Sequence, residues 1–76
     1  MTVVNKGQRK EVTIGFTVEG DEAEVESGTP LETKKTVKNT GETDLFFPAD
    51  FTGSCELTVQ GSKPDSAPDT GTITVA

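Results

Sequence analysis

The sequence predicts a small all-β protein, folded as an antiparallel β-sandwich of about seven strands. Apolar residues alternate with polar ones in several short segments, which is the periodicity of strands with one buried face. Turns rich in Gly, Asn and Pro separate these segments, and no stretch shows helical periodicity. A chain of 76 residues accommodates one domain, so we expect residues 1–76 to share a single core.

The clearest predicted strand covers residues 10–19, where Val12, Ile14, Phe16 and Val18 occupy one face. Gly20-Asp21 then predicts a tight hairpin turn into a short strand at 22–27. In that second strand the inward positions are apolar, and the outward positions form an acidic row. This row consists of Glu22, Glu24 and Glu26.

Five further segments have strand character, namely residues 2–4, 31–38, 44–47, 54–60 and 71–75. The segment 31–38 carries three lysines and few apolar residues, which predicts an edge strand because lysine discourages strands from pairing at an edge. Residues 61–70 are rich in Pro, Ser, Asp and Gly and predict a long loop.

The composition argues against catalysis. The chain has no His, Trp or Tyr and one Cys. Cys55 shares its parity with Leu57 and Val59, so we expect a buried thiol, and a nucleophilic role would need a base that His usually supplies. Hydrolysis by paired carboxylates remains open chemically, but a small sandwich has little volume for such a cleft. We therefore expect a protein that is not an enzyme and has no cofactor.

The net charge of −6 argues against nucleic acids and anionic membranes as partners, because both are polyanionic. No apolar run approaches the length of a membrane span, and residues 1–7 lack the pattern of a secretory signal. We therefore expect either a chain used without this export route or an excised domain. Hydrophobic residues make up 30% of the chain, which predicts a small core that a second copy or a larger protein body would help to stabilise.

Three groups of residues are candidates for binding a protein partner. Phe46 and Phe47 are adjacent, so a strand would place one in the core and leave the other available as an aromatic anchor, with Phe51 tucked inward nearby. The loop 61–70 contributes Lys63, Asp65 and Asp69. The acidic row of Glu22, Glu24 and Glu26 is the third candidate.

The acidic run from Glu19 to Glu26 also has an alternative interpretation as a calcium site, since carboxylate oxygens suit this cation. Its spacing does not match an EF-hand loop, and alternation along a strand spreads the carboxylates in a row. A solvated acidic face is the simpler interpretation, and we expect no metal site.

The stretch SGTPLETKKTVKNTGETDLFF combines a Gly-containing turn, a strand ending at Val37-Lys38-Asn39, a Thr-Gly turn and an apolar strand. This pattern resembles part of the bacterial immunoglobulin-like repeats of the CARDB kind. The resemblance implies an immunoglobulin-like β-sandwich that serves as a spacer or binding module in surface or secreted proteins.

The sequence thus favours a structural or interaction module. We expect a small accessory protein of a virus particle, such as a phage capsid decoration or tail component located on the virion. One alternative is a single immunoglobulin-like repeat of a bacterial surface or secreted protein, located outside the cell. Another is a small acidic inhibitor of a basic protein.

Overall fold

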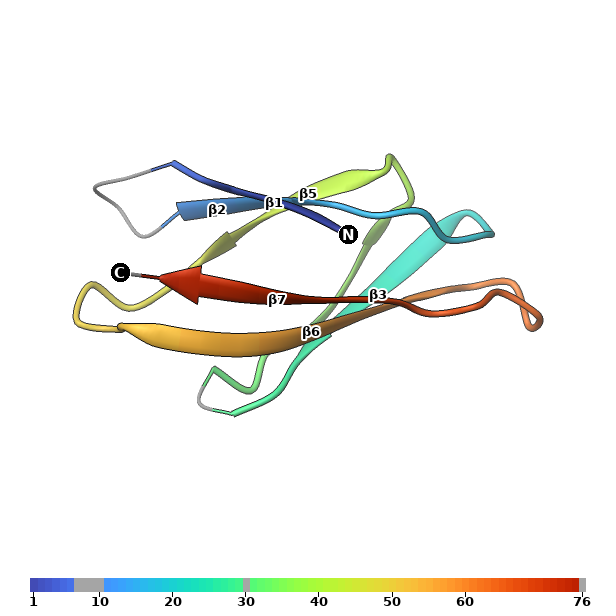
Figure 1. The fold of residues 1–76 in the computed structure, drawn as a ribbon. Coiled ribbons are helices and arrows are strands. Elements are labelled where there is room, and N and C mark those ends of the chain that lie inside the picture. Colours follow the sequence, from blue (N-terminus) through green and yellow to red (C-terminus); the bar gives the residue numbers. More distant parts are fainter. Residues whose placement is uncertain (7–10, 30, 76) are drawn as a thin grey trace.

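The computed structural model describes residues 1–6, 11–29 and 31–75, and it confirms the predicted all-β sandwich (Figure 1). The described residues form seven strands and no helix, so none of them builds a helix long and apolar enough to cross a membrane. The strands are β1 (Thr2–Asn5), β2 (Glu11–Gly15), β3 (Glu22–Ser27), β4 (Lys34–Lys38), β5 (Glu42–Phe46), β6 (Gly53–Gly61) and β7 (Asp69–Val75).

Two antiparallel sheets form the two layers of the sandwich. The three-stranded sheet has the order β1-β2-β5, and the four-stranded sheet has the order β4-β3-β6-β7. In constant-type immunoglobulin domains the fourth strand lies in the sheet of the first strand. Here β4 pairs with β3, so it belongs to the sheet that contains β6 and β7.

The core lies between the sheets and is built from the inward positions of the alternating segments, as the sequence predicts. In β3, for example, Ala23 and Val25 are completely buried while Glu22 and Glu26 are exposed. The buried hydrophobic residues of the described chain are Val12, Ile14, Phe16, Val18, Ala23, Val25, Leu45, Phe47, Cys55, Leu57, Val59, Ile73 and Val75. Residues from both sheets therefore share one hydrophobic core.

The predicted hairpin at Gly20-Asp21 is wrong. The turn exists, but β2 and β3 belong to different sheets, so this connection crosses the sandwich. β2 also ends at Gly15, earlier than predicted, and Lys10 lies outside the described residues. Phe16 and Val18 remain buried beyond the strand, because this segment continues along the core while it passes from one layer to the other.

The lysine-rich segment forms the edge strand β4, as predicted. It starts at Lys34 rather than at Leu31, because residues 31–33 belong to the connection from β3. Glu32 in this connection has a φ of 47°, a left-handed conformation that ends regular pairing. Leu31 still packs against the core, so its apolar character reflects burial rather than strand structure.

Candidate functional site

Phe46 is the most exposed large hydrophobic side chain among the described residues, with 66% of its surface accessible. It ends β5, where side chains alternate between the core and the solvent. Its neighbours Leu45 and Phe47 are 3% and 5% exposed, so the prediction that adjacent phenylalanines separate into one core residue and one exposed residue is confirmed.

A polar network lies on the same outer face as Phe46. The register places Phe46 opposite Glu11 of β2, and the Lys6 Nζ lies 3.6 Å from Glu11 Oε1. The same ammonium lies 3.7 Å from Asp44 Oδ1, and the Thr13 hydroxyl donates a 2.6 Å hydrogen bond to that oxygen. The hydroxyl is the largest influence that lowers the pKa of Asp44, and the nearby Lys6 lowers it further.

Val4, the other exposed large hydrophobic residue, lies on β1 opposite Thr13 and is 52% exposed. We call Val4, Lys6, Glu11, Asp44 and Phe46 together the Phe46 face. It joins two apolar side chains to charges of both signs, an arrangement typical of an anchor with a polar rim. Sequence reasoning missed Val4, Lys6, Glu11 and Asp44, because they come from three different segments.

Phe47 and Phe51 stack on each other and leave the Phe46 ring alone at the surface. Their ring centroids lie 5.0 Å apart with an interplanar angle of 25°. Phe47 is in the core, and Phe51 is half-buried against it, as predicted. Of the three phenylalanines proposed as partner contacts, Phe47 therefore packs in the core, Phe51 is partly exposed, and Phe46 is mostly exposed.

The loop between β6 and β7 is shorter and better anchored than the sequence predicted. β6 extends to Gly61 and β7 starts at Asp69, so residues 62–68 remain as the loop. Ser66 is buried: its hydroxyl accepts a hydrogen bond from the Glu19 amide at 3.0 Å, and its carbonyl accepts one from Gln60 Nε2 at 2.7 Å. Lys63 and Asp65 are exposed at the tip of this anchored loop.

Two glycines make this anchoring possible. A Cβ on Gly61 would overlap the carbonyl oxygen of Glu19, which belongs to the backbone. A Cβ on Gly20 would lie 2.7 Å from the amide nitrogen of Lys63, and the φ of Gly20 is +112°, which L side chains rarely adopt. The crossing from β2 to β3 and the β6–β7 loop thus approach each other more closely than other residues would allow.

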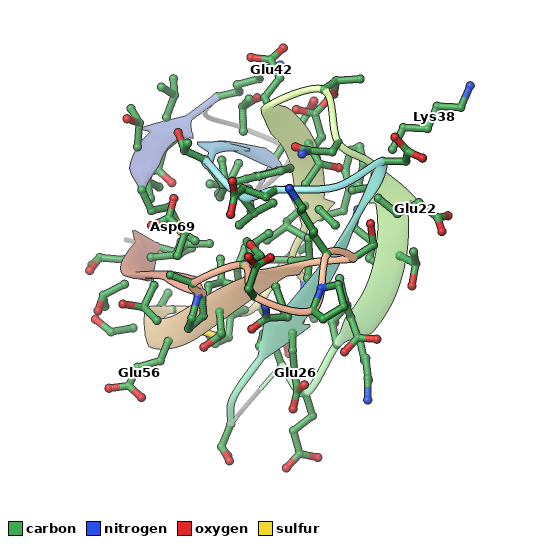
Figure 2. The ribbon with its side chains drawn as sticks, turned by 90° about the vertical axis from the view of Figure 1, so that its right-hand side faces the viewer. Glu22, Glu26, Lys38, Glu42, Glu56 and Asp69 are labelled. Carbon is green, nitrogen blue, oxygen red and sulfur yellow. The ribbon has the colours of Figure 1, made fainter. Side chains whose placement is uncertain are left out.

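Asp69 belongs to β7 rather than to the predicted loop. Its carboxylate contacts two residues that are distant in the sequence, Thr17 and Met1. Its Oδ2 accepts a 3.0 Å hydrogen bond from the Thr17 amide, and its Oδ1 lies 3.2 Å from the amine of Met1. The Thr17 hydrogen bond is the main cause that lowers the pKa of Asp69. Figure 2 shows Asp69 between the two layers, so this carboxylate links the layers instead of facing a partner.

The acidic row of β3 faces solvent as predicted, but β4 supplies lysines beside it. Glu22 lies opposite Lys38 and Glu26 lies opposite Lys34. The Lys34 Nζ is 3.7 Å from Glu24 Oε1. Opposite charges across neighbouring strands attract each other, so the row is less able to attract a basic partner than its sequence implies. In Figure 2, Glu22 and Glu26 point outward from the four-stranded sheet.

Carboxylates and the Cys55 thiol are among the described side chains whose chemistry suits metal binding or nucleophilic attack. Among these residues no group of three or more Asp, Glu, Cys or His side chains could hold a metal ion. Cys55 is buried as predicted, with its Sγ 3.6 Å from the carbonyl oxygen of Gly28. The outer face of the four-stranded sheet has shallow polar hollows, one of them lined by Glu26, Ser27, Gly28, Glu56 and Thr58.

The structure does not bring the predicted contact residues together. Phe46 is the last residue of β5, and this strand ends toward the left of Figure 1, whereas the loop 62–68 between β6 and β7 lies at the opposite end. The long axis of the molecule measures 37 Å. The acidic row lies on the outer face of the other sheet. The three groups are therefore separate surfaces.

Comparisons with protein-family models, with curated proteins and with solved structures gave no match to this chain. The resemblance to CARDB-type repeats therefore stays a prediction, and the fold rests on the structure itself.

Proposed function

We propose that this protein is a non-catalytic interaction module that docks on a larger protein through the Phe46 face. The main observation that supports this proposal is the exposure of the Phe46 side chain. A ring that is 66% exposed keeps its apolar surface in water, while the core is filled by other residues. Exposed aromatic side chains bordered by polar groups are favoured anchors in protein interfaces.

The polar network supports docking at this face because its charges are already paired. Lys6 bridges Glu11 and Asp44, and Thr13 also holds Asp44. A partner that covers Phe46 would meet side chains with restricted positions, so docking would cost less conformational entropy than it would with free lysine and carboxylate groups.

The specific role we propose is that of an accessory protein on a virus particle, such as a capsid decoration or tail component. A particle provides the large body that a small domain with one docking face requires. The acidic composition and compact β-sandwich suit a surface component that must remain soluble before assembly. This role places the protein on the virion.

A second candidate is a repeat in a chain of similar domains on a bacterial surface. One observation favours it: β1 and β7 run side by side in the same direction, with Met1 near Asp69 and Asn5 near Thr74. The first strand therefore starts at one end of this pair and the last strand finishes at the other. This geometry suits domains joined end to end.

Affinity capture tests both functions and the inhibitor alternative. The tagged protein is exposed to a lysate of its source, including virus particles, and retained proteins are identified by mass spectrometry. A matched capture uses Phe46→Ser, and a control uses Lys63→Ala/Asp65→Ala at the opposite end. We expect a capsid or tail protein that Phe46→Ser loses and the loop variant keeps. A basic enzyme as the main product would favour inhibition, and retention unaffected by Phe46→Ser would contradict docking at this face.

A further inference from the structure

The edges of the two sheets differ in how their outward backbone groups are occupied. Hydrogen bonds alternate along an antiparallel pair, so every second residue of an edge strand directs its N–H and C=O away from the sheet. In β5 the outward residues are Glu42, Asp44 and Phe46, because the Phe16 amide donates to the Gly41 carbonyl at 2.8 Å. These positions are open to an added strand unless other groups occupy them.

Side chains occupy outward carbonyls on two of these edges. In β5, Lys35 Nζ donates to the Asp44 carbonyl at 2.7 Å, and the Thr40 hydroxyl donates to the Glu42 carbonyl at 3.1 Å. In β7, Asn5 Nδ2 donates to the Thr74 carbonyl at 3.3 Å. Such contacts protect an edge against another strand.

Within the described residues, the edge of β4, like that of β7, has one occupied outward carbonyl among three, but lysines rather than threonines flank its free positions. The Ser27 amide donates to the Thr33 carbonyl, and the Asn39 amide donates to the Asp21 carbonyl, so alternation directs Lys34, Thr36 and Lys38 away from β3. The Thr40 amide donates a hydrogen bond to the Lys38 carbonyl, so this outward acceptor is already used. Among the hydrogen bonds between described residues, none occupies the carbonyls of Lys34 or Thr36.

The charges on β4 determine which strand could pair with this edge. Lys34 and Lys38 have exposed side chains on either side of Thr36. Antiparallel pairing of two copies about Thr36 would place Lys34 of each copy opposite Lys38 of the other, and like charges in that position repel. An added strand with acidic residues at the corresponding positions would be attracted by Lys38, and at Lys34 it would compete with Glu24 of β3, whose Oε1 lies 3.7 Å from the Lys34 Nζ.

We propose that the free edge of β4 receives an extended acidic segment of a partner protein as an added antiparallel strand. The pairing on the other side of β4 provides the pattern: Glu22, Glu24 and Glu26 of β3 stand opposite Lys38, Thr36 and Lys34. The segment would therefore carry acids at positions i and i+4. The backbone of this segment would form hydrogen bonds with the backbone N–H and C=O groups of Lys34 and Thr36. Its carboxylates would contact the side chains of Lys34 and Lys38. This site is separate from the Phe46 face and does not depend on it.

A synthetic peptide with the sequence of residues 20–28 serves as the probe, because it carries three glutamates at alternate positions. Amide hydrogen exchange of the full chain is followed by NMR at low salt, with and without the peptide at millimolar concentration. A control peptide carries Gln in place of the three glutamates. We expect the acidic peptide to slow exchange at least threefold at Lys34 and Thr36, and the control peptide to have little effect. Two results would overturn the proposal: equal protection by both peptides, or protection of other amides while those of Lys34 and Thr36 exchange at an unchanged rate.

Two variants distinguish the contribution of backbone hydrogen bonds to peptide binding from the contribution of charge. Thr36→Pro removes the outward N–H while leaving the pairing with β3 in place, since proline is tolerated on the free side of an edge strand. Lys34→Gln/Lys38→Gln keeps the backbone and removes both charges, and Lys63→Gln is the distant control. We expect peptide affinity to fall at least tenfold for Thr36→Pro and at least fivefold for the double variant. Full affinity in the folded double variant would contradict the proposed acid recognition.

Discussion

The two ends of the sandwich are held together by different interactions. At the end with Gly20 and Gly61, hydrogen bonds that Ser66 accepts from the Glu19 amide and from Gln60, together with backbone hydrogen bonds, join the connections. At the opposite end, Phe47 and Phe51 stack against each other and the core. The hydrogen-bonded end satisfies its own polar groups, whereas the aromatic end leaves the Phe46 ring in solvent. This difference is why we place docking at the aromatic end.

The largest effect expected from one substitution is at the aromatic end. Phe47→Ala should lower the free energy of unfolding by about 3–5 kcal/mol, because it leaves a cavity and exposes the face of Phe51. Phe46→Ala is the matched control and should change it by less than about 0.5 kcal/mol, since the ring is already exposed. Urea denaturation measures both, and similar losses for the two variants would contradict the division of roles.

At the hydrogen-bonded end, Gly61→Ala should destabilise the protein by about 3 kcal/mol, the upper part of the range for overpacking. The new methyl group would collide with the Glu19 carbonyl, and the backbone cannot yield as a flexible side chain would. Gly28→Ala is the control, because its Cβ meets no heavy atom within 4 Å. Equal denaturation midpoints for the two variants would show that the close approach is unimportant.

Ser66→Ala should have a smaller effect at the same end, a loss of about 1 kcal/mol. The substitution removes the acceptor of the Glu19 amide but keeps the carbonyl that Gln60 contacts. Exchange of the Glu19 amide, followed by NMR, should become faster in the variant while the amides of the β3–β6 pair stay protected. Unchanged exchange at Glu19 would mean that the hydroxyl does not anchor the loop.

The smallest expected effect concerns pH. Folding lowers the pKa of Asp69, so its contribution to stability is present above the unfolded pKa and is lost as the pH falls through the folded pKa. Asp69→Asn should therefore reduce the melting temperature near neutral pH, and this difference should shrink as the pH falls through the folded pKa and the carboxylate becomes protonated. A constant difference between the two proteins from pH 7 to pH 2 would contradict this ionic role.

The sequence was informative about local structure because alternation reports which side chains are buried. It predicted the separation of Phe46 from Phe47, the burial of Cys55 and the edge position of the lysine-rich strand, and all three are confirmed. Each depends on the parity of a single segment and on the polarity of its faces. The outward direction of the glutamates in β3 follows in the same way.

Long-range pairing explains what the sequence could not predict. Gly20-Asp21 indicates a change of direction, but a turn does not identify the strand that is paired next, and β3 joins the other sheet. The composition of residues 61–70 indicates a loop, yet Gly61 belongs to β6, where it pairs with Ala23 of the sequence-distant β3, and Asp69 belongs to β7, where it pairs with Val59 of β6. The lysines opposite Glu22 and Glu26 likewise depend on register, which only the paired strands define.

Fluorine NMR of the protein labelled at its four phenylalanines tests docking through Phe46 most directly, because three of the rings act as internal controls. A soluble paramagnetic reagent should broaden the Phe46 signal strongly, Phe51 partly, and Phe16 and Phe47 least. Addition of the captured partner should then protect Phe46 at least fivefold without changing Phe16. Continued broadening of Phe46 in the saturated complex would contradict the account.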